Sequence, residues 1–102
     1  MDIFRENLTA VIKSGKYFVG IKETLKAVSS GEAKLVIIAG DTSVGLKTAV
    51  EKKAKKAKVE ALVFAGSMKE LGHACGKSFK VSCMAITDQM AAGMICSMVD
   101  GF

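Results

Sequence analysis

A glycine and a lysine stand together at a predicted helix start near residue 20. Ile21, Leu25 and Val28 recur at the spacing of one helix face, so the sequence predicts a helix that begins directly after Gly20. Lys22 then lies in the first turn, where the helix dipole favours anions over cations. A phosphate bound to the N–H groups of that turn would make the lysine favourable, and a glycine allows its close approach. The segment therefore predicts a phosphate site, with an ordinary surface lysine as the alternative.

Glu23 follows Lys22, and Lys26 comes one helical turn later along the same edge. A carboxylate beside phosphates is repelled unless it accepts hydrogen bonds, for example from the edges of bases. Two phosphate-holding lysines around one base-reading acid therefore predict nucleic-acid binding that is specific for sequence or shape.

A second candidate contact is Phe79, which sits between Lys77 and Lys80 just before a predicted strand. An aromatic side chain placed among cations can pack on a splayed base or on the RNA backbone. The alternative is a phenylalanine that faces the core. The sequence alone leaves both interpretations open.

The sequence is poor in groups that could do catalysis. The single histidine, His73, falls inside a predicted helix, and the acids are scattered without a close pair. The run from Gly40 to Thr48 nearly matches a phosphate-binding P-loop, but Lys47 is one place late, which turns it by about 100° on a helix. We therefore expect no enzyme activity, no small-molecule substrate and no cofactor.

The three cysteines, Cys75, Cys83 and Cys96, form no metal-binding spacing with His73. We expect no metal site and interpret all three as small buried hydrophobic residues in a reducing compartment.

The formal net charge is +5, and fourteen of the fifteen basic residues are lysines. This excess suits an anionic partner. The densest run, over residues 51–58, predicts either a solvated helix face or phosphate contacts. Lys47, Glu51, Lys55 and Lys58 should share the face opposite Leu46 and Val50.

Hydrophobic periodicity predicts helices that alternate with strands, which indicates an α/β fold with about four strands between helical layers. Continuous apolar runs over 35–39 and 61–65 predict strands that are buried on both faces. Ser67 and Glu70 form a capping box for a helix that ends at Gly76. The other predicted elements are a helix ending near Ser14, a strand over 17–19, a helix over about 21–29, a turn and helix cap over 40–43, a helix with the stripe Leu46, Val50, Ala54 and Ala57, a strand over 81–86, and a short edge strand over 94–99.

The length of 102 residues fits one domain, and half of the residues are apolar, which is enough for a core. No apolar run approaches the roughly 20 residues that cross a bilayer, and the acidic, polar N-terminus is unlike a signal peptide. We therefore expect a single intracellular domain over residues 1–102 that has no membrane partner.

Three blocks of the sequence resemble a known family. These are G-I-K-E-T-L-K-A-V, G-E-A-K-L-V-I-I-A and E-L-G-H-A-C-G-K-S-F-K-V-S-C-M-A-I. Together they resemble the L-thirty-e family of archaeal and eukaryotic large-subunit ribosomal proteins, in its eukaryotic branch. That family belongs to the kink-turn-binding superfamily that includes the L-seven-Ae proteins. The resemblance runs from about Leu8 to Met98.

The resemblance implies a three-layer α/β/α sandwich around a mixed sheet, and RNA contacts from three places. These are the helix start (Gly20, Lys22, Glu23, Thr24, Lys26), the loop after the central strand (Gly40, Asp41) and the loop before the fourth strand (Phe79, Lys80, Val81, Ser82). It further implies a structural constituent of the large ribosomal subunit that stabilises a kink-turn in rRNA, in the cytoplasm and beside other ribosomal proteins. The alternatives are a kink-turn component of a small ribonucleoprotein that modifies or processes RNA, and a protein-interaction regulatory domain of the same fold.

Overall fold

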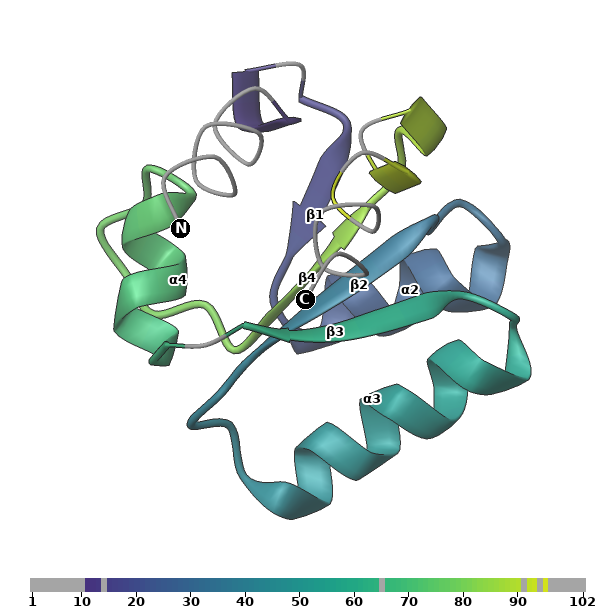
Figure 1. The fold of residues 1–102 in the computed structure, drawn as a ribbon, viewed down its shortest axis with the longest axis horizontal. Helices are drawn as coiled ribbons and strands as arrows, with labels where there is room; N and C mark the ends of the chain where they lie inside the picture. The colour runs from purple at the N-terminus through teal and green to yellow at the C-terminus, as the bar shows by residue number, and fades with distance from the viewer. Residues whose placement is uncertain (1–10, 14, 65, 91, 94, 96–102) are drawn as a thin grey trace.

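The computed structural model describes residues 11–13, 15–64, 66–90, 92, 93 and 95. Its four strands form one sheet, in the order β1-β4-β2-β3, and Figure 1 shows the helices placed around it. Strands β2 and β3 pair in parallel, whereas β4 runs antiparallel to both β1 and β2. The labelled elements are β1 (Tyr17–Val19), α2 (Ile21–Ser30), β2 (Leu35–Ala39), α3 (Val44–Lys56), β3 (Glu60–Phe64), α4 (Met68–Ala74) and β4 (Cys83–Ile86).

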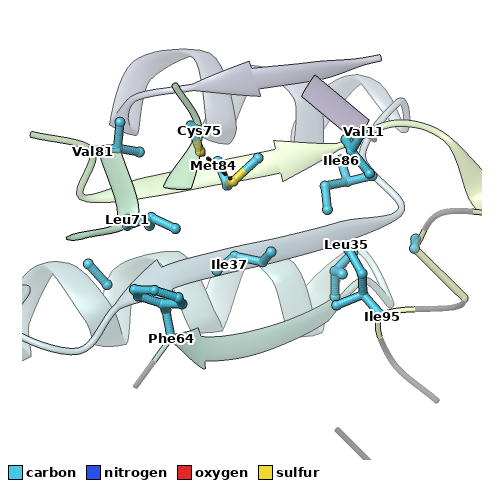
Figure 2. Close-up of a cluster of buried hydrophobic side chains, with 12 residues drawn as sticks. Val11, Leu35, Ile37, Phe64, Leu71, Cys75, Val81, Met84, Ile86 and Ile95 are labelled. Carbon is cyan, nitrogen blue, oxygen red and sulfur yellow. Dashed lines mark hydrogen bonds between the residues drawn. The ribbon is translucent and has the colours of Figure 1, made fainter. Parts of the chain in front are cut away.

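Strand β2 divides the interior into two cores, because successive side chains of a strand point to opposite faces. Leu35 and Ile37 pack with residues of α4 on one face, and Figure 2 shows this cluster around Leu71 and Met84. Val36 and Ile38 pack on the other face against α2 and α3. The result is a three-layer α/β/α sandwich around a mixed four-stranded sheet, as predicted.

The prediction that the strand over 61–65 is buried on both faces was wrong. Strand β3 lies at the edge of the sheet, and only Phe64 of its residues is buried, whereas Val63 is 50% exposed. A continuous apolar run therefore does not by itself indicate a central strand, since β3 has such a run and lies at the edge of the sheet.

The strand predicted over 81–86 begins two residues later, at Cys83. Val81 is buried, but its N–H donates to the Met68 carbonyl oxygen of α4 (3.0 Å). This loop residue is therefore bonded to a helix and cannot extend the strand.

Helix α3 differs from its prediction at both ends. Ser43 precedes it without a capping hydrogen bond from its side chain, and the Thr42 hydroxyl donates to the Ser82 carbonyl oxygen instead. At the other end, Ala57 is exposed and lies beyond the apolar stripe, because the helix ends at Lys56. Lys47 is half-buried and does not lie on the open face, since its ammonium turns back toward Gly40.

The chain ends lie largely outside the described residues. Residues 11–13 are helical, as predicted for the first helix, and Gly15 follows with a φ of 74°. Of the edge strand predicted over 94–99, the structure describes only Ile95, which is helical and buried.

Two of the three cysteines behave as the sequence predicted. Cys75 and Cys83 are buried free thiols, and Cys75 Sγ lies 3.5 Å from Met84 Sδ (Figure 2). Burial raises the pKa of Cys75 to about 11 and also raises the pKa of Cys83, where the Thr24 and Ser82 hydroxyls oppose the rise. Both thiols therefore stay protonated at neutral pH. Cys96 lies outside the described residues.

Candidate nucleic-acid interface

The three segments predicted to contact RNA meet at one end of the sheet. Strand β4 lies between β1 and β2 and runs opposite to both, so the loop before β4 is flanked by the ends of β1 and β2. On one side the Gly20 N–H donates to the Cys83 carbonyl oxygen (2.9 Å). On the other side the Ala39 N–H donates to the Ser82 carbonyl oxygen (2.8 Å). We call this end of the molecule the loop end.

Gly20 sets the direction in which α2 starts. Its φ of 98° is a conformation that L side chains rarely adopt, so a glycine is needed between β1 and α2. No side chain caps α2 at this position. The first N–H groups of α2, which have no acceptor within the helix, therefore begin directly behind the glycine.

Glu23 and Glu70 occupy the same position in the first turns of α2 and α4, but they have different surroundings. In α4 the Glu70 carboxylate accepts from the Ser67 N–H (3.1 Å) and completes the predicted capping box. In α2 the equivalent N–H, that of Gly20, is already bonded to β4. The exposed Glu23 carboxylate consequently has no hydrogen-bond partner within the described part of the chain. It is free to accept hydrogen bonds from a ligand.

The lysines at the loop end are exposed. Lys22 and Lys26 lie one turn apart on α2, and Lys80 lies in the loop before β4. None of the three forms an ion pair with a described residue. Lys77, by contrast, is half-buried and has a partner within the chain: its Nζ lies 5.4 Å from the centroid of the Tyr17 ring. A hydrogen bond to Tyr17 raises the pKa of Lys77, so this lysine stays charged.

Phe79 is 56% exposed and belongs to neither core, so the core-facing interpretation of this residue was wrong. Its ring lies beside a depression of about 500 Å³ between α4 and the loop before β4. The depression is lined by Lys69, Glu70, His73, Lys77, Ser78, Phe79 and Lys80.

Two predicted site residues have buried side chains. Thr24 is completely buried, and its hydroxyl lies close enough to the Cys83 thiol to act on the pKa of that group. Val81 is 1% exposed. Because both side chains are buried, these two residues present no exposed side chain to a ligand.

The loop after β2 is tied to its neighbours within the chain. The Gly40 N–H donates to the Gly66 carbonyl oxygen (2.8 Å), and its own carbonyl oxygen accepts from Lys47 Nζ (3.2 Å). Asp41 Oδ1 accepts from the Met68 N–H (2.7 Å) at the start of α4. Gly40 and Asp41 therefore join β2 to β3 and α4, while both remain exposed.

Sequence reasoning missed two residues that build the loop end. Thr42 is buried and bonds the loop after β2 to Ser82. Gly72 allows α4 to lie against the loop that carries Phe79, because a Cβ at this position would meet the Phe79 carbonyl oxygen at 2.1 Å. A glycine inside a predicted helix was the available signal for the second of these.

The arrangement offers anion binding and hydrogen-bond acceptance, and little catalytic chemistry. His73 is exposed on α4, and no group of three or more His, Cys, Asp or Glu residues within the described ranges could hold a metal ion. Among the described helices none has the length and apolarity to cross a membrane.

The sequence of this chain matches a known protein family. Residues 2–95 match the model of the Ribosomal protein L7Ae/L30e/S12e/Gadd45 family, and the chain belongs to this family. It is similar to the large ribosomal subunit protein eL30 of Branchiostoma belcheri, with 45% identity over 98 residues, 96% of this chain and 86% of that protein. The eL30 of Yarrowia lipolytica is 45% identical over 87 residues, 85% of this chain and 80% of that protein. The resemblance to the L-thirty-e family is thereby confirmed. These relatives are ribosomal proteins, which also confirms that the chain is not an enzyme.

Two solved structures share the fold. A protein of unknown function from Bacillus halodurans superposes with a TM-score of 0.89 at 21% identity, covering 95% of this chain and 96% of that one. The 15.5kD RNA binding protein of Giardia lamblia gives a TM-score of 0.75 at 24% identity, covering 97% of this chain and 82% of that one. Both confirm the three-layer architecture.

Proposed function

We propose that this protein is a structural constituent of the large ribosomal subunit that binds and stabilises a kink-turn in rRNA. The proposal rests on the way in which the chain is arranged at the loop end. Three segments that are distant in the sequence meet there, and they carry exposed lysines, an exposed aromatic ring and a carboxylate that has no hydrogen-bond partner among the described residues.

Each group has a distinct part in the proposed binding. The first turn of α2 and the lysines beside it hold phosphates, as a helix start and nearby cations do. Glu23 accepts hydrogen bonds from guanine N–H groups in a G·A pair of the internal loop. Phe79 packs on a base or on the backbone where the strand bends. Together these contacts fit a bent internal loop better than a regular duplex, whose base edges are paired and less accessible to one protruding carboxylate.

The names of the relatives support the ribosomal setting, since both are named large ribosomal subunit protein eL30. The proposed partners are accordingly rRNA and neighbouring ribosomal proteins, on cytoplasmic ribosomes. Crosslinking the protein to RNA in cells and sequencing the recovered fragments tests this setting. Large-subunit rRNA is the expected product. A guide RNA would favour a small ribonucleoprotein, and no RNA would favour a protein-interaction domain.

Binding of a short kink-turn RNA should depend moderately on salt. If Lys22, Lys26 and Lys80 each neutralise one phosphate, the logarithm of the affinity falls with the logarithm of the salt concentration with a slope of about −2 to −3. Lys22→Ala should weaken different kinked RNAs by similar factors, because a phosphate contact carries no sequence information. Titrations at several salt concentrations measure the slope. A slope of zero would mean that these lysines are merely solvated.

Phe79→Ala should separate binding from stability. Because the ring is 56% exposed, its removal should leave the melting temperature nearly unchanged. Loss of a contact with RNA should cost about 1–3 kcal/mol of binding free energy. Melting curves and binding isotherms on the same variant test this. A loss of about 3–5 kcal/mol in unfolding free energy would instead indicate a core role.

A further inference from the structure

Helix α3 and the two residues after it carry the whole net charge of the chain. The segment 44–58 contains six lysines and one glutamate, which gives +5 and equals the formal net charge of all 102 residues. The remaining sequence contains nine basic and nine acidic residues. The net positive charge is therefore concentrated on one segment, and the basic residues elsewhere are balanced in number by acidic ones.

Five of these lysines crowd the C-terminal end of the helix. We call them the α3 lysine cluster, and all five are exposed. Helix geometry places Lys52, Lys55 and Lys56 on the side opposite Val50 and Ala54, which are buried against the sheet. The full cluster is Lys52, Lys53, Lys55, Lys56 and Lys58.

Lys58 stands in a backbone conformation that favours glycine. Its φ is 60°, and it is the only non-glycine residue with positive φ among the described residues. Helices α2 and α4 end in the same way, but there the left-handed residue is Gly31 or Gly76. All three ends share one pattern, in which the N–H of the left-handed residue donates three residues back and the next N–H donates five residues back.

This comparison separates two explanations for the lysines. Cations near the last turn of a helix are favoured by its dipole, which accounts for basic residues on α3 itself. The dipole does not explain why Lys58 occupies a left-handed position, where the other two helices have glycine. A strained residue that the fold does not need is a sign of a functional requirement.

We propose that the α3 lysine cluster is a second RNA contact, which binds the phosphate backbone of a duplex segment outside the kinked loop. The proposal rests on the proposed function in that its partner is RNA. Lysines act as flexible point charges that bind phosphates whatever the base sequence. The exposed large hydrophobic residue of α3, Val44, lies at the other end of the helix, so the cluster surface is charged and not apolar.

The position of the cluster fits one RNA that covers both surfaces. Helix α3 has 13 residues and is thus about 20 Å long. It starts beside the loop end, after β2, and finishes next to the first residue of β3, at the opposite end of the sheet (Figure 1). A stem leaving the kinked loop and following α3 would reach the cluster.

The test uses the full chain and three RNAs. One RNA is a kink-turn with short stems, and the others carry one stem or the other extended by about one helical turn. One extended RNA should bind about tenfold more tightly than the short one at ~0.1 M salt, with a salt slope steeper by about 2. Lys52→Gln combined with Lys56→Gln should abolish this gain and leave binding of the short RNA unchanged.

A matched control removes the same charge elsewhere. Lys13 and Lys16 are exposed and lead into β1, at the edge of the sheet opposite β3. Lys13→Gln combined with Lys16→Gln should keep the gain from the extended stem. If both double variants lose the gain equally, the effect is one of net charge and the proposed contact is wrong.

Lys58→Gly gives an independent readout. The variant should melt a few degrees higher, because glycine relieves the backbone strain. Its gain in affinity from the extended stem should be about threefold smaller than that of the wild type. Higher stability with an unchanged gain would contradict a role for Lys58. If the extended stems add nothing for the wild type while kink-turns are still preferred over duplex, the second contact fails and the proposed function stands. Loss of the preference for kink-turns would instead overturn the proposed function.

Discussion

Replacing Gly72 by alanine is expected to destabilise the protein by about 1–2 kcal/mol and to displace the loop that carries Phe79. The added Cβ would lie 2.1 Å from the Phe79 carbonyl oxygen and 3.4 Å from the Val81 nitrogen. Both neighbours are backbone atoms, which cannot turn away as a side chain does. The loop must therefore move from α4, and the hydrogen bond from Val81 to Met68 weakens. The cost is that of overpacking, partly offset by about 1 kcal/mol from the higher helix propensity of alanine.

Chemical denaturation measures the stability of this variant, and titration with kinked RNA measures the effect on the loop. Gly45→Ala is the matched control, because Gly45 is also helical and its Cβ would meet no atom within 4 Å. The control should keep or raise the stability. If Gly72→Ala is as stable as the control and binds RNA normally, then close packing of α4 on the loop does not shape the binding surface.

Glu23→Lys should reduce binding to a kink-turn while increasing binding to unstructured RNA. The substitution adds two units of positive charge at the start of α2, so pure electrostatic attraction would strengthen the binding of every RNA. A carboxylate that accepts hydrogen bonds from a base is lost at the same time. We expect that loss to dominate for the kinked RNA, at about 1–3 kcal/mol, or roughly 5- to 150-fold.

Glu23→Gln is the companion variant, since it retains the shape and removes the charge. If Glu23 only favours the positive end of α2, this variant should lose about 0.3–1 kcal/mol of stability and keep its preference for kinked over duplex RNA. If Glu23 reads a base, the preference should fall. The informative quantity is the ratio of the two affinities at one salt concentration. An unchanged ratio in both variants would remove Glu23 from the recognition site.

Local patterns in the sequence were enough to predict most elements of the fold. The apolar run over 35–39 is a strand buried on both faces, and Ser67 with Glu70 forms the capping box that starts α4. These features depend on residues that are close in sequence. The helix start behind Gly20 belongs to the same group, and its exposed Lys22 and Glu23 followed from helix periodicity.

Features that depend on the order of the strands could not be predicted in this way. Strand β3 reads like β2 but lies at an edge, because the sequence does not state which strands become neighbours. The partner of Asp41 is Met68, 27 residues away, and the burial of Thr24 depends on β4 packing against α2. The sequence could not predict the exposure of Phe79 either, because that exposure depends on how α4 packs against the loop through Gly72.

The central claim is that the loop end recognises a kink in RNA. The most direct test is a competition experiment, in which the wild-type protein holds a labelled kink-turn RNA and is challenged with an unlabelled duplex of equal length and similar composition. We expect the duplex to compete at least about a hundredfold less well than the unlabelled kink-turn. Equal competition by the duplex and the kink-turn would contradict the claim and reduce the loop end to a general basic surface.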